Sequence, residues 1–488
     1  MTDDLGGYTT DTLYPAQLQS KLTPGWLAAS ALRNGWRAPE PRGAFRMLDI
    51  GCGDGIGLAV TAASHPEAEF EGLDGMAEHI ARGQAFARDL PNIRLHHMLF
   101  DQALEAGGAP CDFVTMHGVI AWVAPPIRAQ ALALASQRLA PGGLCAISYN
   151  AMPGWSDRLG YQHMIYRIAG SLPGDGRARY FAAHDQVRAL AEAGFPGIPL
   201  SVVDFFESMQ GKVSPDYFAH EFLNSGFQPL WSAHVRAEMS AHGLTYLGQA
   251  EYERIRPDFS LTARQQAELD KVTDPDEWDT AYDLAVNSPF RIDLYGKAPR
   301  RAEAHAFDRV WLSARGGADA TLQVKTPAGT LKFDNPAARG VLEALQDGPA
   351  TLIDLAGRLD LGLADIRNAT DCLALSGLVQ PCAPPGPTDL AEALNRRLSE
   401  AARSPAGAPI SALAGAHGPI SAKEPAIGVL YGSAEEIIAS ARHDAVIRDR
   451  YFHDEVDLED PAIAQELDAA CKRERRRLAR RGIPVPKV

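Results

Sequence analysis

Apolar residues in the first 150 positions occur in short runs, and longer amphipathic stretches separate these runs. Glycines and polar residues bound them, and they cover 46–50, 69–74, 93–99, 113–116 and 144–149. Short apolar runs bounded in this way are typical of buried parallel strands, whereas a stretch such as 129–139 has the length of a helix. Strands that alternate with helices at this pace predict an α/β fold with a doubly wound parallel sheet.

The pattern changes after position 150 and predicts further segments. Helical patterns fill 155–227, and apolar runs at 244–249 and 290–296 are expected to be the last two strands of the same sheet. Beyond position 300, three short helical patterns and a short strand resemble a winged helix. Stretches rich in proline, alanine and glycine at 383–387 and 402–425 are interpreted as linkers or extended connections. We therefore expect a core at 1–154, a helical insertion at 155–227, the end of the sheet at 228–299, a winged-helix-like domain at 300–385 and a C-terminal helical region at 386–488.

Composition narrows the class of protein. The 488 residues include 46% hydrophobic and 22% charged side chains, which fits a globular protein with large cores. The net charge of −14 argues against general nucleic-acid binding, because phosphate contacts dominate that affinity. Six scattered cysteines without a C-x-x-C pair indicate reduced thiols in the cytoplasm rather than disulfides or zinc. The chain starts without an apolar signal-peptide region, and no run of 18 apolar residues predicts a membrane span.

The first predicted strand leads into a glycine-rich turn, MLDIGCGDGIG at 47–57, and a helical stretch follows at once. Glycine lets a ligand approach the backbone closely and a helix N-terminus offers free N–H groups, so this arrangement predicts a cofactor cradle. The dinucleotide pattern G-x-G-x-x-G fails because Ile56 and Leu58 occupy the positions of its third glycine. The Gly-Lys-Ser/Thr of a Walker A loop is also missing. The string instead fits acid-x-G-x-G-x-G, which comprises Asp49, Gly51, Cys52, Gly53, Asp54 and Gly55.

Polar residues also follow the other predicted strands. Asp74 ends the second strand about 20 residues beyond the turn, where an α/β nucleotide fold places the acid that accepts both ribose hydroxyls. Ligands of doubly wound sheets bind beyond the carboxyl ends of the strands, so residues at these ends should meet in one crevice. The residues that we expect there are Gly51, Asp74, Asp101, His117 and Asn150.

The glycine motif together with Asp74 resembles motif I of the class I S-adenosylmethionine (SAM)-dependent methyltransferases, which have a Rossmann-like fold. More specific strings make the chain similar to bacterial methyltransferases that carry a methyltransferase regulatory domain. These strings cover most of residues 8–300 and comprise YTTDTLYP at 8–15, LDIGCGDGIG at 48–57, HGVIAWVAP at 117–125, RLAPGG at 138–143, SYNAMPGW at 148–155, YFAHEFLN at 217–224 and HGLTYLGQAEY at 242–252. The characterised branch of that family includes protein-lysine methyltransferases. The resemblance therefore implies SAM as cofactor and methylation of lysine side chains on a protein substrate.

The resemblance implies roles for residues on the SAM side of the crevice. Asp49 would orient the glycine turn and the SAM amino group. Asp101 would accept the exocyclic amine of adenine, or would be a plain loop acid. The backbone at His117 and Gly118 would touch the methionyl end of SAM, and the His117 imidazole could be a base or a structural histidine. Trp122 could wall the pocket or be a core aromatic.

On the acceptor side, the segment Ser148–Asn150 ends the fifth strand where the substrate nucleophile should arrive. Tyr149 or Asn150 could accept a hydrogen bond from an amine. The N-terminal segment would fold over the site as a lid and bring the rings of Tyr8 and Tyr14 near the cationic sulfur, whereas without the family argument it would be a frayed terminus. The chain has Leu-Thr-Pro at 22–24 where family members tend to have Thr-His-Pro, so a role for a lid histidine is not carried over.

The remaining features concern partners and alternatives. His220 and Glu221 suggest the zinc motif H-E-x-x-H, but Asn224 occupies the position of its second histidine, so no metal is expected. The insertion is placed where a protein substrate or the second subunit of a homodimer could dock. The candidate recognition helix at 363–377 has one arginine against two acids, which favours protein over nucleic acid. Two alternatives stay open: a methyltransferase for a small molecule or an oxygen nucleophile, and a non-catalytic scaffold that binds SAM.

Overall fold

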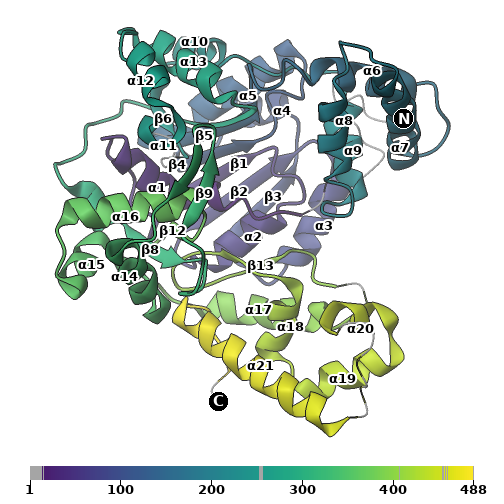
Figure 1. Cartoon of the computed structure of the whole chain (residues 1–488), viewed down its shortest axis with the longest axis vertical. Coiled ribbons are helices and arrows are strands. Elements are labelled where there is room, and N and C mark those ends of the chain that lie inside the picture. The colour runs from purple at the N-terminus through teal and green to yellow at the C-terminus, as the bar shows by residue number, and fades with distance from the viewer. Residues whose placement is uncertain are drawn as a thin grey trace.

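A seven-stranded sheet forms the centre of the computed structural model, which describes residues 14, 16–251, 256–405, 407–452, 456, 458 and 460–486 (Figure 1). The strands follow the order β3-β2-β1-β4-β5-β7-β6. Their bounds are β1 Arg46–Ile50, β2 Glu69–Asp74, β3 Ile93–His97, β4 Cys111–His117, β5 Leu139–Asn150, β6 Thr245–Gln249 and β7 Phe290–Gly296. Strands β1 to β5 pair in parallel, and β7 runs antiparallel to both β5 and β6. The prediction of a Rossmann-like α/β sheet is confirmed, with all seven expected strands present.

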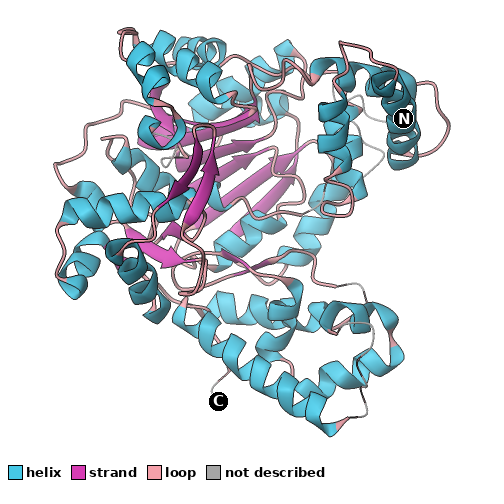
Figure 2. Cartoon of the chain, viewed as in Figure 1, coloured by secondary structure: helices cyan, strands magenta, loops and turns pink. Residues whose placement is uncertain are grey.

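Helices cover both faces of this sheet (Figure 2). Because successive side chains of a strand point to opposite faces, Met47 of β1 belongs to one core while Leu48 and Ile50 belong to the other. The helices that pack on the Met47 face are α1 (Pro24–Arg33), α2 (Ile56–Ala63) and α3 (Ala77–Ala87). The helices on the opposite face are α4 (Phe100–Ala106), α5 (Pro125–Arg138) and α10 (Ser232–Ala241).

Four of the five helices between β5 and β6 lie together at the upper right of Figure 1. They are α6 (Leu159–Ala169), α7 (Gly176–Glu192), α8 (Leu200–Glu207) and α9 (Pro215–Phe222). Stacked aromatic rings hold them together: Tyr180 lies over Phe218 at 4.9 Å between ring centroids, and Tyr161 lies over Phe206 at 5.0 Å. Helix α9 begins sharply because Ser214 accepts a hydrogen bond from the Asp216 N–H and Pro215 fits the first turn. This short helix faces the carboxyl end of the sheet.

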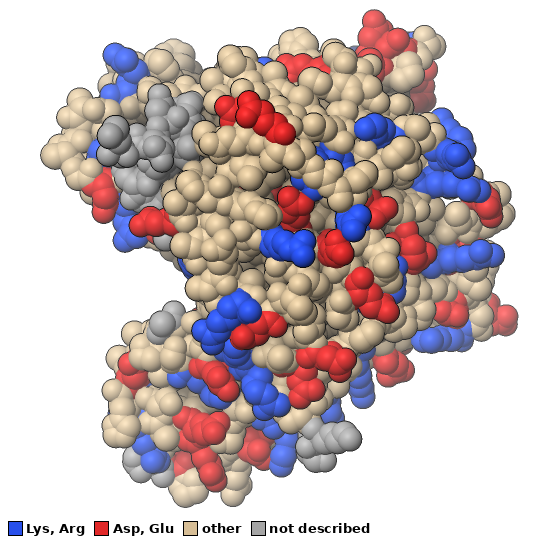
Figure 3. Space-filling model, turned by 180° about the vertical axis from the view of Figure 1, so that it is seen from behind, with Lys and Arg blue, Asp and Glu red and all other residues tan. Residues whose placement is uncertain are grey.

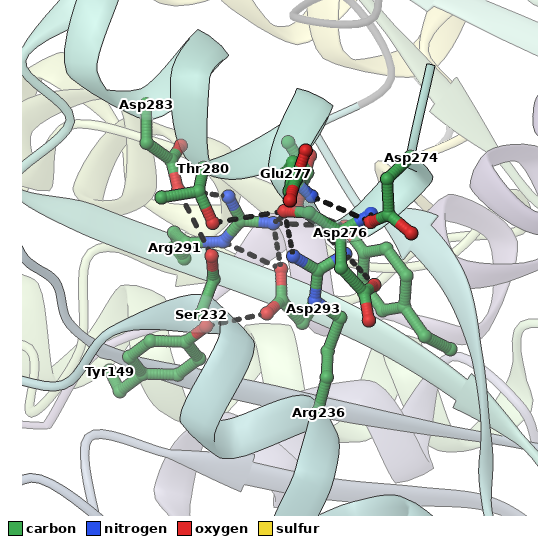
Figure 4. Close-up of polar contacts among 12 residues, drawn as sticks. Tyr149, Ser232, Arg236, Asp274, Asp276, Glu277, Thr280, Asp283, Arg291 and Asp293 are labelled. Atoms are coloured by element: carbon green, nitrogen blue, oxygen red, sulfur yellow. Dashed lines mark hydrogen bonds and ion pairs between the residues drawn. The ribbon is translucent and has the colours of Figure 1, made fainter. Parts of the chain in front are cut away.

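A buried cluster of ions joins the last two strands to the helices beside them (Figure 4). Arg291 of β7 is fully buried and pairs with Asp279 at 2.7 Å, with Asp293 at 3.0 Å and with Asp283. Asp279 and Asp283 belong to α13 (Pro275–Val286), which follows α11 (Pro257–Ser260) and α12 (Ala263–Leu269). The Tyr149 hydroxyl of β5 donates to Asp293 at 2.6 Å. Arg291 also donates to the Tyr246 hydroxyl of β6 at 2.9 Å, so the cluster ties α13 and three strands into one unit.

The next segment contains a small sheet of order β11-β8-β12. Its strands are β8 (Trp311–Ala314), β11 (Ala350–Thr351) and β12 (Val379–Cys382), and β9 (Gln323–Thr326) pairs with β10 (Gly329–Lys332) beside them. The accompanying helices are α14 (Pro336–Ala344), α15 (Leu352–Leu359) and α16 (Leu363–Leu375), the last close to the expected 363–377. Short 3₁₀ helices are η1 (Ser20–Leu22), η3 (Ala306–Arg309) and η4 (Leu345–Asp347).

Part of the stretch at 402–425, expected to be a linker or an extended connection, packs into a core. Ile410, Ala412 and Leu413 are buried and belong to the same core as Ala59 and Val60 of α2. The strands β13 (Ala412–Leu413) and β14 (Ile420–Ser421) pair within it, and α17 (Asp389–Ala402) and α18 (Glu424–Tyr431) flank it. The chain continues with α19 (Ala434–His443), α20 (Ala445–Tyr451) and α21 (Pro461–Arg480). None of the helices in the described part of the chain is long and apolar enough to cross a membrane.

Candidate active site

A cavity of about 350 Å³ lies at the carboxyl ends of the parallel strands. The turn after β1, the ends of β2, β4 and β5, and helix α9 all contribute to its wall. Tyr14 and residues 16–19, 22 and 23 line it from the N-terminal side. The lining residues that the sequence singled out are Tyr14, Asp49, Gly51, Cys52, Gly53, Asp74, Asp101, His117, Gly118, Trp122 and Asn150. Tyr8 lies outside the described residues.

The glycine turn needs a backbone that other residues rarely adopt. Gly51, Gly53 and Gly55 have φ of 72°, 58° and 64°. A Cβ on Gly53 would meet nothing within 4 Å, so this residue leaves space open on the cavity side. Gly55 differs from the expectation because it does not line the cavity. A Cβ there would come within 2.6 Å of the Leu95 side chain, so Gly55 permits close packing under the turn.

Asp74 is bound from several directions. One carboxylate oxygen accepts the Gly53 N–H at 3.0 Å, and the other accepts the Met76 N–H at 2.8 Å. The second oxygen also lies 3.4 Å from His79 Nδ1, and His79 Nε2 accepts the backbone N–H of Tyr14 at 3.2 Å. Since Nε2 accepts, the imidazole proton resides on Nδ1 and points toward Asp74. The N-terminal segment is thereby connected to the acid at the end of β2.

Asp49 presents its carboxyl group to the cavity, where Thr115 Oγ1 donates to it at 2.7 Å. Burial, with a smaller contribution from the Asp74 charge, raises the pKa of Asp49 to about 7. A cationic group placed beside it would favour the ionised form. Burial likewise raises the pKa of the Cys52 thiol, so this thiol remains protonated and is not a nucleophile.

The residues after β4 and β5 form the opposite wall. His117 Nδ1 lies 2.6 Å from Ser148 Oγ, and burial lowers the pKa of His117 to about 4, so the imidazole is neutral at physiological pH. The Gly118 N–H donates to the same Ser148 oxygen at 3.0 Å. Trp122 fills both of its expected roles, because it lines the cavity and also packs on Phe227 with ring centroids 4.5 Å apart. Asp101 lies at the exposed rim, where it accepts the Gln102 N–H.

The structure separates the two residues proposed to receive an amine. Asn150 lines the cavity. Tyr149 does not: its side chain is fully buried, and its hydroxyl donates to Asp293 in the ion cluster of Figure 4. Adjacent residues of a strand point to opposite faces, so only one of the two can reach the site. The prediction of a catalytic role for Tyr149 is therefore wrong.

Two further residues, His220 and Glu221 of α9, line the cavity and were missed as site residues. Burial raises the pKa of Glu221 to about 7, although hydrogen bonds from Tyr217 and Asn150 oppose this shift. The His220 ring lies edge-on to the Tyr14 ring with centroids 5.3 Å apart. The available signal was the string YFAHEFLN at 217–224, which supports the family resemblance but whose His-Glu pair suggested only a zinc motif.

The residues around the cavity fit SAM. The volume is in the usual range for a small-molecule site, and the open face of Gly53 allows close approach to the backbone. The carboxyl groups of Asp49, Asp74 and Asp101 line this cavity, and carboxylates suit the hydrogen-bond donors and the positive charge that SAM carries. A side chain at position 53 would occupy the open space beside the turn, and the cavity would then no longer fit SAM.

Comparisons with known proteins agree with this fit. The family model "Methyltransferase domain" matches residues 17–199, and "Predicted methyltransferase regulatory domain" matches residues 214–297. An uncharacterized protein of Synechocystis is 24% identical over 365 residues, which are 72% of this chain and 71% of that protein. The chain spans about half the length, 48% and 49%, of two Rickettsia prowazekii relatives that it matches. Trans-aconitate 2-methyltransferase of Azoarcus is 29% identical over 29% of this chain and 49% of that enzyme.

A solved structure extends the likeness over nearly the whole chain. PKMT2 from Rickettsia typhi, in complex with AdoHcy, superposes with a TM-score of 0.70 at 15% sequence identity, covering 96% of this chain and 100% of that one. The sheet order, the glycine turn, the acid after β2 and these matches define a class I SAM-dependent methyltransferase. The chain contains a methyltransferase domain followed by a segment that matches the predicted methyltransferase regulatory domain, and its cofactor is SAM.

Proposed function

We propose that this enzyme transfers the methyl group of SAM to the side-chain nitrogen of lysine residues in a protein substrate. The observation that carries this proposal is the charge of the cavity wall. Among the described residues that line the cavity there is no Lys or Arg, whereas five are acidic: Asp49, Asp54, Asp74, Asp101 and Glu221. Opposite charges attract more strongly in a partly buried site, so a cationic acceptor such as a lysine ammonium suits these walls.

SAM supplies a methyl group that is already activated by its positively charged sulfur. The task of the chain is therefore to position the acceptor and to exclude water. Asp49, Asp74 and Asp101 would hold the cofactor. Asn150 would accept a hydrogen bond from the amine and orient its lone pair. Tyr14 would cover the site and present its ring to a cation.

A small-molecule acceptor is the alternative that the trans-aconitate 2-methyltransferase relatives suggest. An enzyme for a polycarboxylate needs cationic groups near the substrate, because a buried carboxylate without a partner is costly. The absence of Lys and Arg from the described lining argues against such a substrate here. The charge of the lining argues less strongly against a hydroxyl group as methyl acceptor. The experiment below therefore distinguishes a hydroxyl from an amine acceptor.

Other parts of the chain would serve substrate docking. The helices α6 to α9 and the winged-helix-like segment at 300–385 are proposed as protein-contact surfaces, and the insertion as the site of homodimer formation. Figure 3 shows a hollow in the outline between the part that contains α17 to α21, below, and the part above it. On that face basic and acidic side chains are interspersed, which supports a protein rather than a nucleic acid as partner. The reaction is proposed to occur in the cytoplasm.

The test is transfer of label from methyl-labelled SAM to the proteins of a cell lysate, followed by acid hydrolysis and amino-acid analysis. Methylated lysine is expected. Gly53→Arg is the control, because an arginine there would fill the open space that Gly53 leaves in the cavity. A base-labile methyl ester, or label confined to small molecules, would contradict the lysine assignment while leaving methyl transfer intact.

A further inference from the structure

We propose that Glu221 is the group that takes the proton from the substrate's ammonium, and that Asn150 and Tyr217 hold its carboxylate for this task. The proposal rests on the proposed function, because it assumes an amine acceptor. It adds a residue of the segment at 214–297 to the chemistry of the site. It also specifies the form in which the acceptor arrives, namely as a primary ammonium rather than as a free amine.

The position of Glu221 is the first argument. Helix α9 places it in the cavity wall together with Asn150, which ends β5 at the acceptor side. The other acidic lining residues belong to the strand ends and loops that hold the cofactor: Asp49, Asp54, Asp74 and Asp101. Glu221 is thus the one carboxylate among the described lining residues that comes from the helices beyond β5.

The surroundings of Glu221 are the second argument. Its carboxylate accepts hydrogen bonds from the Tyr217 hydroxyl and the Asn150 amide, which fixes its direction. The titratable groups that interact with it are Tyr14 from the N-terminal segment and Tyr217 from α9, and Arg158 interacts with Tyr217 in turn. His117 from β4 and His220 from α9 line the same cavity. Burial raises the pKa of both tyrosines, so they stay neutral, and His117 is neutral as well. The described lining of the cavity contains no Lys or Arg that would compete with a substrate ammonium for Glu221.

The proton balance is simple. The ammonium N–H bond breaks and its proton passes to a Glu221 oxygen, which leaves a neutral amine with a free electron pair. That pair forms the new N–C bond to the methyl carbon, and the electrons of the broken C–S bond remain on sulfur. The product is a methylammonium ion, and protonated Glu221 returns its proton to water. The raised pKa of Glu221, about 7, suits a base that must bind and release a proton near neutral pH.

The decisive variant is Glu221→Gln, which keeps the size of the side chain and removes the base. With saturating SAM and lysate protein as acceptor, we expect a loss of about 10²-fold or more in rate at pH 7, and SAM affinity within twofold of wild type. The residual rate should rise steadily with pH, because only acceptors that are already neutral would react. Glu69→Gln, at the exposed start of β2 and away from the cavity and the proposed docking surfaces, is the matched control and should keep the wild-type rate.

Two measurements separate a catalytic from a structural effect. In Tyr217→Phe the Glu221 carboxylate loses the hydrogen bond from the Tyr217 hydroxyl, which lowers the pKa of Glu221 in wild type. The midpoint of the pH–rate profile should therefore move to higher pH. Without SAM, the thermal stability of Glu221→Gln should exceed that of wild type by an amount that grows from pH 5 to pH 8. If Glu221→Gln methylates lysine within threefold of the wild-type rate at pH 7, this proposal fails and the lysine assignment stands. If wild type labels no lysine, the proposed function fails first.

Discussion

Asp49→Asn should stabilise the unliganded enzyme and at the same time weaken SAM binding. The carboxyl group of Asp49 faces the cavity between the Thr115 hydroxyl and the Asp74 carboxylate. Burial raises its pKa from 3.8 to about 7, which means that the folded protein without ligand disfavours the ionised form. Asparagine keeps the oxygen that accepts from Thr115 and removes the charge.

The magnitude follows from that shift. Between pH 3.8 and 7 the unfolded chain is ionised at this residue while the folded chain is protonated, so stability falls as pH rises through this window. The shift of about 3 units corresponds to at most about 4 kcal/mol at 1.36 kcal/mol per unit. Water in the open cavity reduces this penalty. We therefore expect the variant's advantage over wild type to grow by about 1–2.5 kcal/mol between pH 5 and pH 8.

Thermal denaturation at pH 5 and pH 8, with and without SAM, measures both effects. Calorimetry at pH 8 should show SAM affinity reduced by about 10-fold or more, the usual cost of losing a charge-assisted hydrogen bond. Asp89→Asn, at an exposed surface residue, controls for the general effect of removing a negative charge. A variant that is no more stable than wild type at pH 8, or that binds SAM equally well, would refute the role assigned to Asp49.

Three other perturbations test separate parts of the structure. Asp74→Asn should weaken SAM binding by about 1.5–3 kcal/mol in calorimetry, because the ribose hydroxyls lose a charged acceptor; unchanged affinity would exclude Asp74 from the cofactor site. Arg291→Met should lower the free energy of unfolding by about 3–5 kcal/mol in urea titrations, because three buried carboxylates lose their partner, whereas exposed Arg37→Met should cost at most about 1 kcal/mol. Deleting residues 1–20 should reduce turnover far more than melting temperature; full turnover in the truncated enzyme would show that the segment is not a lid.

The sheet could be predicted from the sequence because its signals are local. Apolar runs bounded by glycines and acids identify strands without knowledge of their neighbours, and the seven strands agree with this expectation. The residues that follow them meet at one edge because parallel strands share a direction. Gly51, Asp74, Asp101, His117 and Asn150 accordingly line one cavity.

The directions of side chains and the contacts between distant segments could not be predicted from local sequence patterns. The string SYN marked the end of β5, but which of Tyr149 and Asn150 faces the cavity depends on the pleat of the strand and on a buried partner 144 residues away. Gly55 fits the motif, yet its role is decided by contact with Leu95. The stretch at 402–425 has the composition of a linker, yet its apolar residues Ile410, Leu413 and Ile420 share a core with α2.

Glu221 could not be predicted as a site residue for a different reason. The cavity that it lines is formed by two segments of the chain that meet only in the folded protein. The segment matched by the methyltransferase domain, 17–199, supplies the glycine turn and the acids that suit SAM, while the segment matched by the regulatory domain, 214–297, supplies His220, Glu221 and Phe290 to the same cavity. The ion cluster around Arg291 also lies largely in the second segment, and through Asp293 it fixes Tyr149, the neighbour of Asn150. Because Tyr149 is held on one face of β5, Asn150 must face the cavity. Under the proposed function the second segment would complete the acceptor half of the site, and substitutions in it should change transfer to the substrate while leaving SAM binding close to wild type.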